Sequence, residues 1–380
     1  MNYKRVFHVW VSIVGVIVAF IIVATVVIDP INAIGFPLIK GINNNKYAQD
    51  QYMDVYKPFE LARKEADVIL IGTSRVYRGI RPTFEGVMNE KVYNLGMSSL
   101  SLDHMKAYLQ FAYKIHQPKK VFIGLDLFNF SRTNFKNRKV GFSQDRLDNI
   151  NRNFSIYHAI IESLQLNKSL LKNTFVKSHK NRCASLLFSN GWYIRDDDAP
   201  EIVPEGYYYN LNDYKNVYKE FKYSEEAITC LEHIVNEAKE RGIEVFVFFN
   251  PINADIRNIV YLSGHGESLA DIKKQIVRRI GRVYDFNFNN AYTESRKLYY
   301  DCSHYSPKMG EYIKADILVG HETERMHILT SDNIDRQLEK DYTRYQDWVS
   351  KNKEYVNLMT EKIKSNGKIE EGEFKDILGF

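Results

Sequence analysis

The stretch that decides the fold is Val68-Ile69-Leu70-Ile71-Gly72-Thr73-Ser74-Arg75. Its four apolar residues are typical of a buried parallel strand, and Gly72 ends the run. Ser74 then lies on the turn after the strand, where α/β sheets place ligands and reactive groups. The alternative is that the serine only caps a helix by accepting backbone N–H groups. The stretch therefore predicts an α/β fold with a candidate reactive serine at the first strand exit.

Strand and helix patterns alternate along the rest of the chain. Further strands are expected at 92–95, 121–125, 243–249 and 283–286. Helices are expected at 102–116, from Ser224 to Gly242, and at 307–318. Strands that alternate with amphipathic helices favour a parallel, doubly wound sheet that is covered on both faces. The pattern predicts five strands in this sheet.

Residues 6–28 form an apolar run that only His8 interrupts. About twenty such residues cross a bilayer. The run is longer than the apolar core of a signal peptide, and Asp29-Pro30 follows it in place of a small-residue cleavage site. Lys4 and Arg5 favour a cytoplasmic N-terminus. We expect residues 1–29 to be a cytoplasmic stub and a single-pass plasma-membrane anchor, with everything after Asp29 outside the cytoplasm.

Composition changes along the chain suggest its domain organisation. We expect a linker at 30–60, an α/β domain at 61–320 with a helical insertion at about 130–223, and a C-terminal helical extension at 321–380. The insertion contains Trp192-Tyr193 and Tyr207-Tyr208-Tyr209. Exposed aromatic rings bind sugars, but burial in a satellite core is the favoured interpretation.

The overall composition excludes several classes of protein. A net charge of +5 over 380 residues is mild, and no nucleic-acid motif occurs. The three cysteines, Cys183, Cys230 and Cys302, form no disulfide framework, and their odd number leaves at least one unpaired within the chain. No metal-ligand spacing occurs, so neither a metal nor a cofactor is expected.

A second motif, Asp301-Cys302-Ser303-His304, lies near the end of the α/β pattern. An aspartate three positions before a histidine can present both side chains on one side of a turn. The carboxylate then orients the imidazole, which can deprotonate a serine from elsewhere in the fold. The alternative is an ordinary surface turn. With Ser74 as nucleophile, His304 as base and Asp301 as its orienter, the two motifs predict an acyl-transfer triad.

These motifs resemble the SGNH hydrolase superfamily, also called GDSL esterases and acyltransferases, over roughly residues 66–130 and 224–320. The closest likeness is to membrane-anchored, extracytoplasmic relatives of the teichoic-acid D-alanylation protein DltD and of the alginate acetylation proteins. Ile71-Gly72-Thr73-Ser74-Arg75 matches the nucleophile block, Asn94-Leu95-Gly96 the second block and Asp301-x-x-His304 the last. The resemblance implies a flavodoxin-like sheet order and oxyanion donors at the N–H groups of Ser74 and Gly96.

Two positions depart from the family pattern. Thr73 replaces the aspartate that usually precedes the nucleophile, and Asp126 stands where the third block has an asparagine oxyanion donor. An ionised carboxylate would repel an oxyanion. Asn129 substitutes for that donor, or two backbone donors suffice, or Asp126 binds an acceptor hydroxyl. Loss of one oxyanion donor lowers an acyl-transfer rate by about 10²–10³.

Three arginines follow the nucleophile: Arg75, Arg78 and Arg81. They are candidates for binding phosphate or carboxylate on a substrate, with an ordinary solvated basic face as the alternative. Cys302 is a weaker candidate nucleophile than Ser74. The resemblance implies an acyltransferase or esterase that acts on a cell-surface polysaccharide or teichoic-acid-like polymer, with a membrane-bound O-acyltransferase partner.

Two other functions remain open at this point. A non-catalytic assembly or binding subunit would keep the fold without the activity, and Asp126 and the aromatic insertion favour it. A P-loop nucleotide or sulfate-donor enzyme is disfavoured, because the chain lacks the glycine-rich loop ending in Gly-Lys-Ser/Thr.

Overall fold

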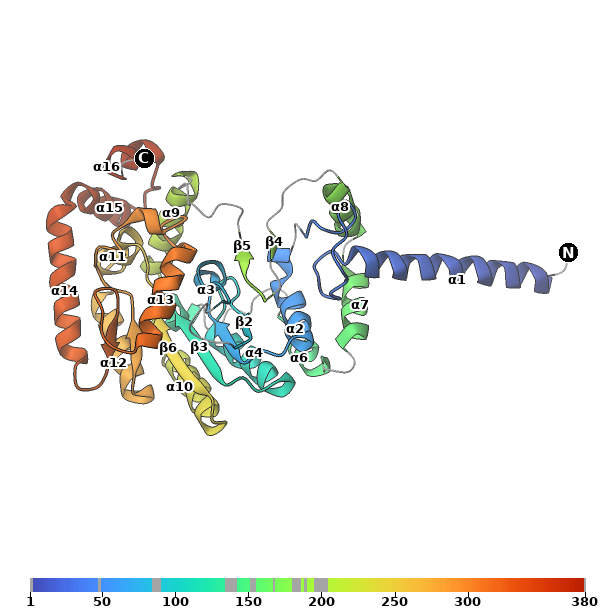
Figure 1. Ribbon diagram of the computed structural model, residues 1–380. Helices are drawn as coiled ribbons and strands as arrows, with labels where there is room; N and C mark the ends of the chain where they lie inside the picture. Colours follow the sequence, from blue (N-terminus) through green and yellow to red (C-terminus); the bar gives the residue numbers. More distant parts are fainter. Residues whose placement is uncertain are drawn as a thin grey trace. The chain divides into compact units, whose positions relative to one another are not determined.

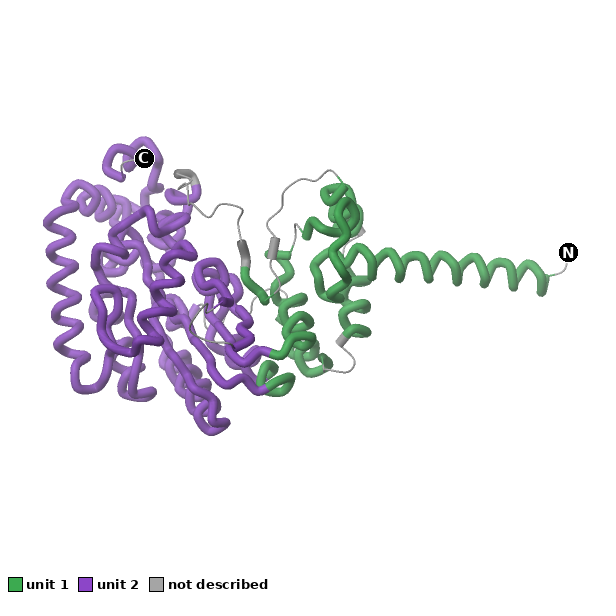
Figure 2. Tube along the Cα trace, viewed as in Figure 1, with its two compact units in different colours: residues 1–65, 111–116, 141–196 green, residues 66–110, 117–140, 197–380 purple. Residues whose placement is uncertain are grey.

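The computed structural model describes residues 3–46, 49–83, 90–133, 142–150, 155–166, 168–179, 186–187, 190–194 and 204–378. The chain folds into two compact units (Figure 2). Unit 1 comprises residues 1–65, 111–116 and 141–196, and unit 2 comprises residues 66–110, 117–140 and 197–380.

Unit 2 contains a six-stranded sheet in the order β2-β1-β3-β6-β7-β8 (Figure 1). Its strands are β1 (Val68–Ile71), β2 (Val92–Asn94), β3 (Lys120–Leu125), β6 (Glu244–Phe249), β7 (Val283–Asp285) and β8 (His327–Leu329). The first five pair in parallel, and β8 runs antiparallel to β7. The parallel strands carry nearly unbroken apolar runs because both of their faces are buried.

The five strands expected from the sequence are confirmed, but the expected five-stranded, all-parallel sheet is wrong. The sixth strand, β8, comes from the segment that was expected to be a purely helical C-terminal extension. It pairs with the free edge of β7 and buries Met326 and Leu329. A strand of three residues is too short for its alternation to stand out in a sequence.

Helices of unit 2 enclose the sheet and extend it at the C-terminus. They are α3 (Ser74–Gly79), α4 (Leu102–Ile115), α9 (Pro204–Lys219), α10 (Glu225–Glu240), α11 (Ala254–Leu262), α12 (Gly266–Ile280), α13 (Pro307–Val319), α14 (Ile334–Lys351), α15 (Lys353–Ser365) and α16 (Glu371–Leu378). The last residues of α4, from Phe111, belong to unit 1. The expected helices α4, α10 and α13 are confirmed. Two short 3₁₀ helices are η2 (Leu127–Phe130) and η3 (Arg296–Leu298).

The core of unit 2 joins the sheet to the helices next to the site. Val76 of α3 and Met309, Ile313 and Ile317 of α13 pack with strand residues such as Leu70 in one buried cluster. Because α3 and α13 share this core, the segments that precede them in the chain are held against the same end of the sheet.

Unit 1 contains α1 (Tyr3–Ile28), η1 (Gln49–Tyr52), α2 (Met53–Arg63), α6 (Gln144–Asn149), α7 (Ser155–Gln165), α8 (Lys168–His179) and the hairpin strands β4 (Leu186–Leu187) and β5 (Tyr193–Ile194). Helix α1 is long and apolar enough to cross a membrane. The structure differs from the linker expected at 30–60, since α2 begins inside that range and buries residues 53–62. The expected insertion at about 130–223 is divided, with residues 141–196 in unit 1 and α9 in unit 2.

Candidate active site

Ser74 is the first residue of α3, directly beyond the exit of β1. Thr73 is the N-cap, and its side-chain oxygen accepts the Arg75 N–H at 3.4 Å. The sequence left open that Ser74 is the helix cap, but the cap is the residue before it, Thr73. Ser74 is half-buried. Its N–H belongs to the first turn of a helix, where backbone N–H groups lack intrahelical acceptors.

The turn from Asp301 to His304 is held by the Asp301 carboxylate. Asp301 Oδ1 accepts the backbone N–H groups of Ser303 at 2.7 Å and of His304 at 2.9 Å. The same carboxylate lies 2.8 Å from His304 Nδ1 through Oδ2. His304 Nε2 in turn lies 2.8 Å from Ser74 Oγ. The structure thus brings together Ser74, His304 and Asp301 in one hydrogen-bonded chain, across 230 positions of sequence.

The local environment keeps the Asp301 carboxyl group charged and the His304 imidazole neutral. Burial alone would raise the pKa of Asp301, but His304 and the two backbone N–H groups outweigh it and lower that pKa to about 2. Burial lowers the pKa of His304, and the positive charge of Arg78 lowers it further, although Asp301 acts in the opposite direction. At neutral pH the pair is therefore a carboxylate and a neutral imidazole, which is the state a general base requires.

Arg75 and Asp126 do not contact the open site, contrary to the expectation that they bind substrate. Their side chains are 1% and 0% exposed, and they form a buried ion pair. Asp126 also accepts a hydrogen bond from Thr73 Oγ1 at 2.5 Å and one from Asn250 Nδ2 at 3.3 Å. Asp126 is therefore the counter-ion of Arg75, and neither side chain lines the cavity beside Ser74.

Arg75 connects the two halves of the site. Its Nε donates to the Ser303 carbonyl at 2.8 Å, and its Nη2 donates to Ser303 Oγ at 3.0 Å. Its Nη2 also donates to the hydroxyl of Tyr214 on α9 at 2.5 Å. Because Arg75 follows Ser74 and Ser303 precedes His304, this side chain fixes Ser74 relative to His304. Tyr214 lies outside both motifs, and Ser303 lies within the second motif but had no role assigned from the sequence.

The two expected oxyanion donors other than Ser74 are occupied. The Gly96 N–H donates to Asn94 Oδ1 at 3.0 Å, and the Asn129 amide donates to the Leu100 carbonyl at 2.9 Å. Asn94 uses its own amide to bind the carbonyls of Val76 and Ile80, which fastens the end of α3 to the exit of β2. Gly96 and Asn129 therefore support the site and do not face it.

Two glycines allow α3 to approach α13 closely. A Cβ atom on Gly310 would lie 1.8 Å from the carbonyl oxygen of Gly79, and one on Gly79 would lie 2.0 Å from the ring of Tyr305. No side chain larger than hydrogen fits between the two backbones. The contact lies one turn beyond Ser74 on one side and shortly after His304 on the other, so it sets the spacing of the triad.

A cavity of about 660 Å³ opens beside Ser74 and His304. Its lining is mostly neutral and hydrogen-bonding, from Ser98, Ser99, Ser131, Thr133, Asn210, Asn216 and Asn366. Four charged residues line it as well, namely Arg78, Lys219, Asp213 and Glu220. Several of these residues come from α9, which lay in the expected insertion. Burial raises the pKa of Asp213.

Arg78 is the one arginine of the expected cluster that lines the cavity. It is half-buried, and its Nε donates to the hydroxyl of Tyr77 at 3.2 Å. Arg81 lies beyond the end of α3. Cys302 is fully buried, its thiol contacts the Tyr207 carbonyl, and burial raises its pKa well above the ordinary value. A thiol of this kind is a poor nucleophile.

The aromatic residues of the insertion are mainly buried, as the core interpretation predicts. Trp192, Tyr207 and Tyr208 are buried, whereas Tyr209 is 71% exposed. Cys230 and Cys302 are free thiols, and Cys183 lies outside the described residues. Among the described residues, no group of acidic, histidine or cysteine side chains is arranged to hold a metal ion.

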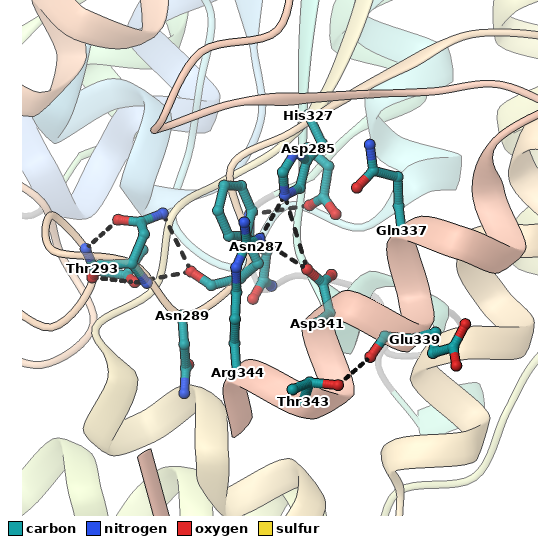
Figure 3. Close-up of polar contacts among 12 residues, drawn as sticks. Asp285, Asn287, Asn289, Thr293, His327, Gln337, Glu339, Asp341, Thr343 and Arg344 are labelled. Atoms are coloured by element: carbon teal, nitrogen blue, oxygen red, sulfur yellow. Dashed lines mark hydrogen bonds and ion pairs between the residues drawn. The ribbon is translucent and has the colours of Figure 1, made fainter. Parts of the chain in front are cut away.

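A second polar cluster lies under the C-terminal extension, at β7, β8 and α14 (Figure 3). Lys273 Nζ lies 2.5 Å from Asp285 and 3.7 Å from Asp341, and all three side chains are at most 2% exposed. His327 Nε2 lies 2.6 Å from Arg344 Nη1, and its ring stacks on Phe288 at 4.0 Å. These groups pair with one another, so the cluster fastens α14 and β8 to the sheet.

No family model matches this chain, and no curated protein matches it significantly.

Proposed function

We propose that this protein is a membrane-anchored serine O-acyltransferase or esterase that works through an acyl-serine intermediate. The observation that carries the proposal is the hydrogen-bonded chain from Asp301 through His304 to Ser74 at the wall of a polar cavity. A serine with a neutral imidazole at hydrogen-bond distance, itself oriented by a carboxylate, is an activated nucleophile.

The reaction follows from the positions of these atoms. Ser74 Oγ attacks the acyl carbonyl while His304 Nε2 takes the hydroxyl proton. The Asp301 carboxylate stabilises the resulting imidazolium. His304 then returns the proton to the leaving oxygen, and an acyl-serine remains. An acceptor hydroxyl attacks the acyl-serine, gives its proton to His304, and leaves as an ester while the proton returns to Ser74.

The tetrahedral intermediates need donors other than Gly96 and Asn129. The N–H of Ser74 is one, since it lies at the start of α3. The turn at Ser98 and Ser99, which lines the cavity, supplies the second. Ser99 has a φ of 50°, a conformation that turns the backbone sharply at this point.

The acceptor that fits the cavity is a polyhydroxylated one. Its lining carries many hydroxyl and amide groups, and its charged residues are two cations and two anions. Such a surface binds sugar hydroxyls better than a highly charged polymer. With α1 as an anchor and the N-terminus in the cytoplasm, the acceptor is a cell-surface polysaccharide or a teichoic-acid-like polymer. A membrane-bound O-acyltransferase is the proposed acyl donor partner.

The test is labelling of the full chain in detergent by a fluorophosphonate, which reacts with activated serines. We expect wild type to be labelled, and Ser74→Ala and His304→Ala to lose labelling. Ser131→Ala is the matched control, since Ser131 lines the same cavity. Labelling that survives in folded Ser74→Ala protein would rule out this nucleophile.

A non-catalytic binding or assembly subunit is the second candidate. The occupied N–H of Gly96 and amide of Asn129 favour it, because the site then has fewer preformed oxyanion donors. It predicts no fluorophosphonate labelling of wild type, and polymer acylation that persists in cells carrying Ser74→Ala. Loss of acylation in that mutant excludes the non-catalytic role.

A further inference from the structure

Helix α7 presents its apolar residues to the outside. Ile156, Tyr157, Ile161 and Leu164 are between 41% and 63% exposed. The residues that α7 buries are the small Ala159 and Ser163. At 100° per residue, the four exposed residues form one continuous stripe. A helix that packs in water buries such a stripe, so this one needs another covering.

The helix that carries the stripe lies at the C-terminal end of α1. Helices α7 and α8 both pack against α1, and α7 lies across its axis at the base (Figure 1). On α8, Phe175 is 45% exposed. In the loop that follows α1, Leu38 and Ile39 are also exposed. These exposed apolar residues, together with the α7 stripe, form a collar: Leu38, Ile39, Ile156, Tyr157, Ile161, Leu164 and Phe175.

The collar is attached rigidly to the end of α1. The Asn43 amide donates to the carbonyls of Val27 and Pro37, and the Ile39 N–H donates to Asn43 Oδ1. Lys46 Nζ donates to the Ile28 carbonyl at 2.9 Å. Asp29 accepts the N–H groups that follow at Ile34, Gly35 and Phe36. These hydrogen bonds hold the loop with Leu38 and Ile39 against the end of α1.

The charge near the collar fits an anionic surface. Helix α8 contains Lys168, Lys172 and Lys177 and no acidic residue. Lys40 and Lys172 are exposed. Apolar side chains flanked by lysines are the pattern of helices that lie in the interface of a bilayer with anionic lipids.

We infer that the collar lies in the headgroup region of the same membrane that α1 crosses, so that unit 1 rests on the lipid surface. A bilayer is the covering that the continuity with α1 favours, because α1 itself ends where the collar begins. The inference concerns unit 1 alone and holds whether or not the triad of unit 2 is active.

The test uses the full chain in vesicles of phosphatidylcholine and phosphatidylglycerol, with Trp10→Phe as the background because Trp10 lies in α1. Trp192 and Trp348 remain, and the emission of this background is subtracted from that of each variant. Tyr157→Trp and Leu164→Trp place a fluorophore on the stripe. Tyr342→Trp is the control, since Tyr342 of α14 in unit 2 is also a half-exposed helical tyrosine. Lipids with brominated acyl chains quench tryptophan on contact.

We expect the added tryptophan at 157 and at 164 to lose about half of its emission in brominated lipid, because an interfacial helix buries its apolar face about 5–10 Å into the headgroup and acyl boundary. Emission at 342 stays unchanged. If quenching at 157 and 164 is no greater than at 342, the inference is overturned. The stripe is then covered by water or by another protein and not by lipid.

Discussion

Two aspartate–histidine pairs of unit 2, Asp301 with His304 and Asp341 with His327, lie in different surroundings, and of these two histidines only His304 adjoins the cavity. His304 has a carboxylate at Nδ1, a serine hydroxyl at Nε2 and a cavity beside it. His327 has an arginine N–H at Nε2, a phenylalanine ring against its face and Asp341 at 3.9 Å. Both histidines have lowered pKa values, chiefly through burial, and that of His327 falls to about 4.

The difference shows that a perturbed pKa does not define a site. Around His327, the buried charges of Lys273, Asp285 and Asp341 pair with one another, and Figure 3 shows Asp341 and Arg344 beside His327. In the triad, the hydrogen-bonded chain ends at a hydroxyl that faces a cavity. The proposed acyl transfer depends on the free end of that chain, and not on the histidine environment alone.

The largest expected effect is the difference in labelling rate between a substitution of Asp301 and one of Asp341. Asp301→Asn should lower the fluorophosphonate labelling rate by about 10³–10⁴-fold, because the imidazole loses the group that holds its tautomer and stabilises its charged form. Asp341→Asn should leave the labelling rate of folded protein nearly unchanged. The measurement is the labelling rate of each purified variant, with circular dichroism as the check on folding. Equal losses in both variants would mean that the two pairs do not differ as described.

The second prediction concerns stability. Lys273→Met removes one partner of a buried ion pair and should lower the free energy of unfolding by about 3–5 kcal/mol. Lys274→Met is the matched control, because Lys274 pairs with Asp335 at the surface, where that aspartate is 81% exposed. It should change the free energy by at most about 1 kcal/mol. Denaturant unfolding of the full chain in detergent measures both, and similar midpoints would contradict the structural role of the cluster.

The third prediction tests the spacing of the triad. Gly310→Ala places a Cβ atom 1.8 Å from the Gly79 carbonyl, so α13 must shift away from α3. Overpacking of this kind costs about 1–3 kcal/mol. A displacement of His304 by about 1 Å can slow labelling by up to about 10²-fold. Gly206→Ala is the control, because no atom lies within 4 Å of its new Cβ. It should change neither the stability nor the labelling rate. Wild-type labelling by Gly310→Ala would show that the close contact does not position the base.

The smallest effect is a shift in pH dependence. His304 must be neutral to act as a base, so labelling should rise with pH, with a midpoint below the ordinary histidine pKa of 6.5. Arg78 disfavours the imidazolium, so Arg78→Gln should move the midpoint to higher pH. Arg344→Gln removes the corresponding charge beside His327 and should leave the labelling profile in place. A midpoint that moves down in Arg78→Gln, or that also moves in Arg344→Gln, would contradict this assignment.

Much of the fold could be predicted because its signals are local. Each parallel strand is a continuous apolar run bounded by a turn residue, and α10 and α13 show clear periodicity or a proline start. Strand β8 could not be predicted, since its three residues gain their structure only by pairing with β7. Helix α2 was also missed, because buried polar residues such as Lys57 and Glu60 conceal its apolar pattern.

The site was predictable in its motifs but not in its supporting contacts. Ser74, Asp301 and His304 stood out because a strand exit and a three-residue spacing restrict where the side chains point. Arg75 was expected to bind substrate, yet the fold encloses it with Asp126 and Tyr214. Whether an arginine lies in a cavity or in the core depends on which distant residues surround it, and local spacing contains no such information.

The sequence by itself determined the parallel strands, the apolar helix α1 and the three residues of the hydrogen-bonded chain, Ser74, His304 and Asp301, because each depends on composition or spacing within a short segment. Only the tertiary structure decided that α9 lines the cavity, that Arg75 links the nucleophile to the base, and that Gly96 and Asn129 are occupied. It also decided that the apolar stripe of α7 faces outward. These features depend on contacts between residues far apart in the chain, and such contacts form only when the whole fold packs together.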